Sequence, residues 1–352
     1  MQKATTSIKR VTVCCAVALA SVLVAACGLM PSDSKIDEGI VNAPKLKIRS
    51  STALAALDLA EVKRGDRLEI LEQAQVKTPT RTNEWYKVRT KTKEATEGWV
   101  EARYVINKSI VDKTQDLYEK SKAISSQGTG RLKVQTRLRV EAGGDVITYL
   151  SRGMMVDIVG KARTTVKPEK QEADDSEDTD EPGTRTVIWY QIRLPESEVL
   201  RAGWVGAQQV QLDTPDEILY LEGEGRRFTG WVVFDQTKPK KGDPKDNYIA
   251  LMKNLSTEGP FDFTRLWVLI YSPEQGHYTG PYIEDGLHGV LPVSIHPDHK
   301  GFTIHQLDEN GKSVAVEYEA IRTDASHLRV KRLSPKIIYK KQPVKIKAKG
   351  KR

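Results

Sequence analysis

Residues 97–105 read EGWVEARYV, and residues 202–210 read AGWVGAQQV. Each segment holds Gly-Trp-Val and closes on a valine six residues after the tryptophan. One shared triplet carries little weight in a chain of 352 residues. A duplicated module, in contrast, repeats its other anchors in the same order, so the flanking sequence tests the idea.

Three further anchors precede both segments. Their alternating apolar residues predict short β-strands. The anchors are LKI (46–48) with LRV (138–140), GDRLEILE (65–72) with GMMVDIVG (153–160), and WYKV (85–88) with WYQI (189–192). The copies differ in loop length, where insertions cost least. The first loop is four residues longer in the first copy, and the loop before Trp-Tyr is sixteen longer in the second.

This set of anchors resembles the bacterial SH3-like (SH3b) domain, over residues 43–107 and 130–212. The resemblance implies two small barrels of five or six short strands that bind peptide or cell-wall ligands through loops and shallow grooves. It supplies no fixed binding motif, so no ligand residue is transferred to this chain. The family's Asn-x-Arg after the first leucine is only partly kept. Arg49 is present in the first copy, whereas Glu141 takes its place in the second.

The Gly-Trp-Val triplet is interpreted as a packing device. Glycine permits close backbone approach, and a tryptophan ring fills a core too small for aliphatic side chains alone. Trp99 and Trp204 are therefore predicted to be structural. In the Trp85 and Trp189 anchors, one member of each Trp-Tyr pair is expected to face inward and the other outward, where it would line a groove.

The N-terminus reads as a secretion signal over residues 1–26. Three basic residues precede the apolar run VTVCCAVALASVLVAAC, which is short for a permanent membrane helix. The quartet Val24-Ala25-Ala26-Cys27 resembles the lipobox of bacterial lipoproteins. That resemblance implies palmitate-type acylation at Cys27 and a membrane anchor. The alternative is an ordinary signal peptide cut near Ala26.

Residues 27–42 are predicted to be a tether between lipid and first barrel. The expected location is the cell envelope. Gly28 stands where an Asp often retains lipoproteins at the inner membrane, so the periplasmic face of the outer membrane is favoured in a two-membrane cell. All three cysteines, at 14, 15 and 27, belong to this N-terminal region, so no disulfide framework is expected beyond it.

Residues 108–129 are predicted to be a helical linker. The helix is expected over 109–124, with Ser109 and Asp112 as a capping box and an apolar stripe that docks the two barrels together. A solvated linker helix is the alternative. Within the second barrel, residues 171–182 hold seven acids and no base, which is typical of a solvated loop. A Ca²⁺ loop would need a turn glycine and fixed ligand spacing, which this segment lacks.

Residues 213–335 are predicted to be a third, all-β domain, a sandwich or a barrel of no recognised family. A short helix is expected near 214–222, with Thr214 as cap and Pro215 first. Gly230-Trp231-Val232 is read as a coincidental third triplet, because no Trp-Tyr segment precedes it. The fold class of the chain is therefore all-β, with two tandem SH3-like barrels joined by a short helix ahead of this domain.

The chemistry-bearing residues point away from catalysis. All six histidines fall in the C-terminal region, at 277, 288, 296, 299, 305 and 327. The pair His296 and His299 flanks Pro-Asp, and surface histidines explain them better than a zinc site. No Gly-x-Ser-x-Gly, His-Glu-x-x-His, P-loop or Cys/His motif is present. No catalytic residue, metal or cofactor is predicted.

The net charge of +8 is concentrated at the termini. The basic tail, residues 336–352, holds eight Lys or Arg residues and the signal holds three, so residues 27–335 carry 8 − 8 − 3 = −3. A nucleic-acid partner is therefore not expected. The tail is expected to be disordered and to serve solubility or attachment to anionic envelope polymers or lipid headgroups.

Together these features predict a non-enzymatic envelope lipoprotein that binds peptidoglycan or envelope peptides through its tandem barrels. Two alternatives stay open. The chain is a scaffold or assembly subunit that binds other envelope proteins, or it is a wall-active enzyme with an unrecognised C-terminal domain.

Overall fold

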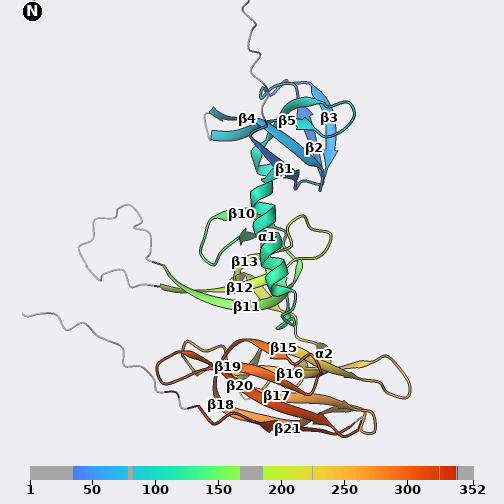
Figure 1. Ribbon diagram of the computed structural model, residues 1–352, viewed down its shortest axis with the longest axis vertical. Helices are drawn as coiled ribbons and strands as arrows, with labels where there is room; N and C mark the ends of the chain where they lie inside the picture. The colour runs from blue at the N-terminus through green and yellow to red at the C-terminus, as the bar shows by residue number, and fades with distance from the viewer. Residues whose placement is uncertain are drawn as a thin grey trace, which may run out of the picture.

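The computed structural model describes residues 35–77, 82–166, 185–223, 225–324, 326–337 and 339. The protein is all-β, with three seven-stranded sheets in chain order. They form an elongated stack, with the first sheet at one end and the C-terminal sheet at the other (Figure 1). The predictions for the signal 1–26, for Cys27, for the acidic loop 171–182 and for tail residues 338 and 340–352 lie outside the described residues.

The first sheet surrounds one small core and has the order β3-β2-β6-β5-β4-β1-β7. A 3-10 turn, Ala102–Tyr104, separates β6 from β7. The strands are β1 (Asp37–Val41), β2 (Lys45–Arg49), β3 (Asp58–Lys63), β4 (Arg67–Lys77), β5 (Thr82–Thr90), β6 (Glu97–Glu101) and β7 (Val105–Asn107).

The second sheet has the same order with each strand renumbered, β10-β9-β13-β12-β11-β8-β14. A 3-10 turn, Ala207–Gln209, again precedes the last strand. The strands are β8 (Thr129–Leu132), β9 (Thr136–Arg139), β10 (Val146–Leu150), β11 (Met155–Val166), β12 (Arg185–Arg193), β13 (Ala202–Gly206) and β14 (Val210–Leu212).

The two sheets agree in local detail as well as in order. Gly65 and Gly153, paired in the sequence alignment, both have positive φ, at 91° and 81°. The ladder between the second and third anchors is shifted at the same point in each copy, directly after Ile70 and directly after Ile158. A repeated β-bulge of this kind is a built feature of a fold. The four anchors therefore mark the same strand arrangement in two copies.

The register corrects the alignment of the first anchor by two residues. Trp99 lies opposite Arg49, and Trp204 lies opposite Arg139. Leu138 therefore corresponds to Ile48 rather than to Leu46. With this register, Arg139 takes the position of Arg49, and the predicted replacement of that arginine by Glu141 is wrong. The sequence match failed here because Thr136, a polar residue, fills the buried position of Leu46.

The prediction that Trp99 and Trp204 fill the cores is also wrong. Both rings are only half-buried, whereas the glycine and valine on either side are buried. Side chains alternate along a strand, so an inward Gly and Val force the tryptophan between them outward. The glycine is required by packing: a Cβ on Gly98 would lie 2.5 Å from the Arg49 carbonyl oxygen.

The first strand overturns part of the predicted tether. Residues 37–41 of the segment 27–42 form β1, which pairs with β4 and with β7. Gly39 packs directly against Val105, and Gly130 packs against Val210 in the same way. The closing valine of each repeat is thus held by a glycine in the first strand of its own sheet. Glycine has no side chain to mark a strand, so periodicity could not reveal β1.

Helix α1 (Lys108–Ser121) joins the sheets, as predicted, although the predicted capping box is wrong. Its N-cap is Asn107, which makes no side-chain capping bond, and Asp112 instead pairs with Lys108 one turn away. Ile110 and Val111 pack against the core of the second sheet. The helix end is capped by Arg193, whose guanidinium donates to the carbonyl oxygens of residues 121 and 124 at 3.3 and 3.0 Å.

The C-terminal sheet is one antiparallel meander, in which every strand pairs with its sequence neighbour. It curls as a half-barrel around a core drawn from all seven strands, which decides between the predicted sandwich and barrel. The strands are β15 (Arg226–Thr237), β16 (Lys245–Asn254), β17 (Phe263–Ser272), β18 (His277–Ile295), β19 (Gly301–Leu307), β20 (Ser313–Arg322) and β21 (Leu328–Arg332).

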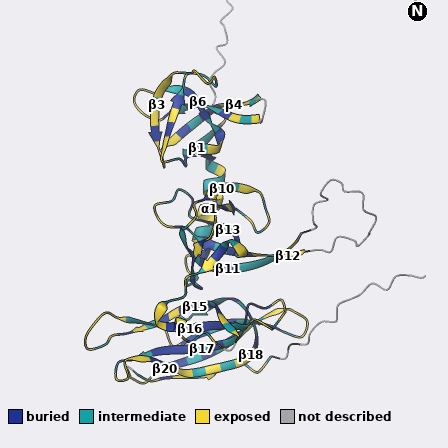
Figure 2. Ribbon diagram, turned by 180° about the vertical axis from the view of Figure 1, so that it is seen from behind, coloured by how far each residue is buried: buried dark blue, intermediate teal, exposed yellow. Residues whose placement is uncertain are grey.

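A second apolar cluster covers the convex face of this sheet. Helix α2 (Asp216–Leu219) supplies Ile218 to it and begins after Pro215 rather than after Thr214. Because β16 is covered on both faces, residues 247–252 are buried without a break, and buried residues follow β16 and β17 in Figure 2.

The start of the basic tail is ordered against this domain. Ile337 packs on the concave core, and the Tyr339 ring stacks on His288 with centroids 4.2 Å apart. The prediction of disorder from residue 336 onward is therefore wrong for these residues. Two apolar side chains among lysines are enough to dock the segment.

The second and third sheets are fixed to each other by buried polar contacts. Asp262, 2% exposed, accepts from Lys161 at 3.1 Å and pairs with Arg163. Gln127 bonds both main-chain groups of Val293, donating to its oxygen at 2.9 Å and accepting from its nitrogen at 2.6 Å. Burial lowers the pKa of the Lys161 ammonium, and the nearby Asp262 carboxylate opposes that shift.

Candidate functional site

A groove of about 800 Å³ lies between the two repeated sheets. Its walls come from β5, from the turn after β6 with β7 and the first turns of α1, and from the loop between β9 and β10 with the start of β10. The lining residues are Thr82, Asn83, Glu84, Tyr86, Glu101, Ala102, Arg103, Val105, Ile106, Asn107, Ile110, Lys113, Val140, Glu141, Gly144, Asp145, Val146 and Ile147.

The groove has fixed walls because the two repeats are joined at several points. Ile106, from the last strand of the first sheet, is buried in the core of the second. The Arg64 guanidinium donates to both carboxylate oxygens of Glu198 at 3.1 and 3.2 Å. Asn42 donates to the Thr148 hydroxyl at 3.1 Å. The opening is therefore set by the fold and needs little ordering when a ligand binds.

The loop of the second repeat is held in place by Arg139. Its guanidinium donates to the Gly144 carbonyl oxygen and lies 5.3 Å from the centre of the Trp189 ring. Arg49 makes the equivalent bond in the first repeat, donating to the Leu54 carbonyl oxygen at 2.7 Å. In both copies this arginine reaches the carbonyl five residues ahead, so it sets the shape of the loop that follows.

Charges of both signs line the groove, with acids in excess. Arg103 pairs with Glu101 at 2.7 Å and lies 4.7 Å from the centre of the Tyr104 ring. Glu141 and Asp145 form no ion pair with another described residue. Two unpaired carboxylates in a concave site favour a ligand that carries an ammonium or guanidinium group.

Apolar side chains also line the groove. Ile110 of α1 and Ile147 of the second repeat face the cavity together with Tyr86. Burial raises the pKa of the Tyr86 phenol, the Glu84 carboxylate adds to that rise, and a hydrogen bond with Asn107 opposes it. Tyr86 thus stays a neutral hydrogen-bonding group at physiological pH. The groove therefore offers a ligand both apolar and charged contacts, at a size in the range of small-ligand and peptide sites.

In each Trp-Tyr anchor, the outward-facing ring was predicted to line a groove, and the structure shows a different arrangement. Trp85 and Trp189 lie on the outer faces but are buried, 5% and 8% exposed. The Trp189 indole donates to the Thr164 hydroxyl at 2.8 Å. Tyr86 and Tyr190 face the cores, and it is Tyr86 that reaches the groove.

Sequence reasoning missed most of the groove because its residues come from turns and loops between the anchors. Arg103 lies in a 3-10 turn, and Lys113 lies on an exposed face of α1. One sequence feature could have indicated the groove, namely a difference in charge between the two repeats. The second repeat carries Glu141 and Asp145 in a loop where the first repeat is apolar.

The histidines of the C-terminal domain have separate local roles. His299 donates to the Phe234 carbonyl oxygen at 2.8 Å, whereas His327 lies 2.8 Å from Asp324. His296 contacts Glu317 at 3.0 Å. Within the ranges that the structure describes, no three His, Cys, Asp or Glu residues gather as a possible metal site.

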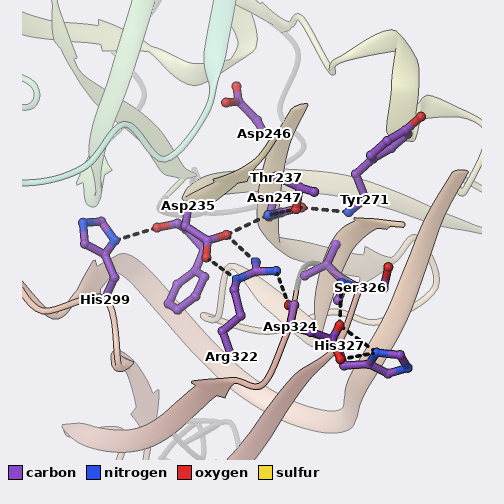
Figure 3. A network of polar contacts seen from close by, with 12 residues as sticks. Asp235, Thr237, Asp246, Asn247, Tyr271, His299, Arg322, Asp324, Ser326 and His327 are labelled. Atoms are coloured by element: carbon purple, nitrogen blue, oxygen red, sulfur yellow. Dashed lines mark hydrogen bonds and ion pairs between the residues drawn. The ribbon is translucent and has the colours of Figure 1, made fainter. Parts of the chain in front are cut away.

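A polar network beside these histidines is fully paired (Figure 3). Arg322 donates to both Asp235 oxygens at 2.9 and 2.8 Å. The fully buried Asn247 donates to Asp235 at 2.7 Å and accepts from the Tyr271 main-chain nitrogen at 2.7 Å. Since each buried group has its partner, the network stabilises the sheet edge and leaves no open polar group for a ligand.

No helix among the described residues is long and apolar enough to cross a membrane.

Comparisons with known proteins give little support for an assignment. No family model and no curated protein matches the chain. Among solved structures it is similar to NlpC2 from Trichomonas vaginalis, at 12% identity and a TM-score of 0.15, over 50% of this chain and 47% of that one. NlpC1 from Trichomonas vaginalis is matched at 9% identity and a TM-score of 0.15, over 79% of this chain and 86% of that one.

The chain thus spans about half the length of the first of these structures. At such TM-scores neither similarity carries an argument about function, which has to come from the chain itself.

Proposed function

We propose that the protein is a non-enzymatic envelope lipoprotein whose two SH3-like units bind a peptidoglycan-derived peptide in the groove between them. The single observation that carries this proposal is the groove of about 800 Å³, whose walls are joined at several points and whose Glu141 and Asp145 form no ion pair with another described residue. Lipid at Cys27 would hold the protein at the membrane. The repeated sheet order and the repeated loop arginine support the SH3-like assignment.

The geometry favours an extended peptide over a compact ligand. Glu141 and Asp145 stand on the loop of the second repeat, and Lys113 stands on α1. Carboxylates would receive a ligand ammonium group, and the lysine would receive a ligand carboxylate. Stem peptides of the cell wall carry both groups, with short apolar side chains that fit between the isoleucines of the walls.

Co-sedimentation with purified peptidoglycan sacculi tests the proposal. The soluble body, residues 28–352, retains every described strand and core contact. It is compared with a form ending at Tyr339, since the structure packs that residue against His288. Pelleting that survives moderate salt and loss of residues 340–352 is expected, because binding lies in the folded units.

Charge reversal in the groove then separates specific from general binding. Glu141→Lys with Asp145→Lys is expected to weaken pelleting by about tenfold or more, the scale of losing two charge-assisted contacts. Asp243→Lys with Glu274→Lys makes the same change of charge on exposed loops of the C-terminal domain, and is expected to have no such effect.

Equal weakening by both double variants would contradict a groove site. Failure to pellet under any condition would favour a scaffold that binds envelope proteins. Release of soluble muropeptides from the sacculi would contradict the non-enzymatic assignment.

A further inference from the structure

The loop between β2 and β3 presents leucines to solvent. Leu54 is 99% exposed and Leu57 is 73% exposed. Ala53 and Ala55, on either side of Leu54, are also exposed. Isolated surface leucines are ordinary, but several apolar residues at the tip of one loop mark an interaction surface.

The exposure is built into the loop. The main chain closes on itself, with the Ser50 nitrogen donating to the Leu57 oxygen at 2.9 Å. The Ser50 hydroxyl also accepts from the Leu57 nitrogen at 3.1 Å. Arg49 holds the Leu54 carbonyl at 2.7 Å. The leucine side chains are therefore presented outward by a fixed backbone.

The second repeat provides an internal control. Its Arg139 fixes the equivalent loop, yet that loop carries Gly143, Gly144 and Asp145 and faces the groove. The shared fold therefore needs no apolar residues at this position. The first repeat instead has a longer loop, and its tip reads Ala-Leu-Ala-Ala-Leu over residues 53–57.

We propose that this loop inserts Leu54 and Leu57 into the lipid surface to which the protein is anchored. The proposal rests on the proposed lipid attachment at Cys27. Only residues 28–34 separate that cysteine from Lys35, the first described residue. The steps from residue 27 to residue 35, at about 3.5 Å each, reach at most roughly 28 Å. The first sheet, at one end of the elongated molecule (Figure 1), is thus held within reach of the bilayer.

A lipid surface fits the chemistry of the loop better than a protein groove. The tip has no charged side chain between Ser50 and Leu57, and both of its leucines are exposed to solvent. Shallow insertion of a few leucines gives weak binding by itself and strong binding when added to an acyl anchor. The loop would then fix the orientation of the stack relative to the membrane.

Site-specific fluorescence tests the insertion. The body 28–352 contains no cysteine, because the three cysteines lie at 14, 15 and 27. Leu54→Cys therefore gives one labelling site for an environment-sensitive dye. The body lacks the acyl chains, so phosphatidylcholine vesicles are added in large excess to populate weak insertion. At high salt, a blue shift and quenching by spin-labelled lipid are then expected. Asp145→Cys, in the equivalent loop, is expected to show neither. No shift at residue 54, or equal shifts at both sites, would overturn the proposal.

Vesicle co-sedimentation measures the contribution of the leucines. Leu54→Asp with Leu57→Asp is expected to lower partitioning by about tenfold or more, with an unchanged melting temperature as the fold control. Leu255→Asp with Leu333→Asp replaces two exposed leucines of the C-terminal domain and is expected to leave partitioning unchanged.

Two outcomes separate this proposal from its premise and from self-association. Mass spectrometry of the native protein reports acylation at Cys27, so failure of the anchor is distinguishable from failure of the loop. Sedimentation velocity reports the oligomeric state of the body. A dimer that the Leu54 and Leu57 variant converts to a monomer, without vesicle binding, would assign the loop to a second copy of the chain instead.

Discussion

Gly98→Ala tests the close packing of strand β6 against strand β2 at the glycine of the Gly-Trp-Val triplet. The new Cβ would lie 2.5 Å from the Arg49 carbonyl oxygen and 2.6 Å from an Ile48 methyl carbon, whereas ordinary contact begins at 3.4 Å. Strands β2 and β6 must therefore separate by nearly an ångström. Overpacking of this kind costs about 1–3 kcal/mol, and more where backbone is the obstacle.

The second repeat gives a graded comparison. A Cβ on Gly203 would meet a Leu138 methyl carbon at 2.5 Å and the Arg139 carbonyl oxygen at 2.9 Å. The nearest obstacle is then the end of a flexible side chain, so Gly203→Ala is expected to cost less. Gly223→Ala, with open space around the new atom, is the neutral control, expected within about 0.5 kcal/mol of the parent.

For a unit of this size each kcal/mol shifts the melting temperature by about 4–8 °C. Gly98→Ala is therefore expected to melt roughly 5–20 °C below the parent in the first sheet. Calorimetry gives the shift, and hydrogen exchange read peptide by peptide assigns it to a sheet. A Gly98→Ala protein that melts within about 2 °C of the parent would refute the packing assigned to the triplet.

Three further predictions concern the C-terminal domain. Asp262→Asn removes the anion between two cations of β11 and is expected to cost about 3–5 kcal/mol in urea unfolding; a loss under 1 kcal/mol would contradict the buried ion pair. Gln127→Leu leaves the main-chain nitrogen and oxygen of Val293 in β18 without their buried partner, which costs about 1–3 kcal/mol for each group. Amide hydrogen exchange in β18 is expected to become faster, and an unchanged exchange rate would contradict this role of Gln127. Burial lowers the pKa of the His288 imidazole, so the folded state binds fewer protons than the unfolded state, and docking of Tyr339 is expected to weaken as pH falls below about 6.5. Limited proteolysis of the tail measures the undocking of Tyr339 at each pH. His288→Phe is expected to remove the pH dependence, so equal acid sensitivity of the parent and the His288→Phe protein would show that His288 is not its cause.

The sequence predicted the strands whose buried positions are filled by apolar side chains. Four anchors in order located both repeats, because their apolar residues alternate as in buried strands. The strand that pattern missed, β1, is fixed by Gly39, which has no side chain to contribute to a pattern. The register error at Leu138 has a related cause, since a buried Thr136 replaces the expected apolar residue.

The candidate site was largely beyond sequence reasoning. The groove is formed by loops and turns of two successive units, and their relative position depends on contacts such as Arg64 with Glu198. Neither residue belongs to an anchor. The outward orientation of Trp99 was also hidden, because the Gly-Trp-Val pattern is compatible with either face of a strand. Only the register between strands decides it.

The central claim is that the groove between the repeats is the ligand site, and fluorescence at its rim tests that claim most directly. Thr82 is exposed and lines the groove, so Thr82→Cys in the cysteine-free body carries a dye without removing a charged group. Titration with a purified muropeptide is expected to give a saturable change that Glu141→Lys abolishes, while a dye at Asp243→Cys stays silent. A dye at residue 82 that does not respond, or that responds no differently from one at residue 243, would contradict the account.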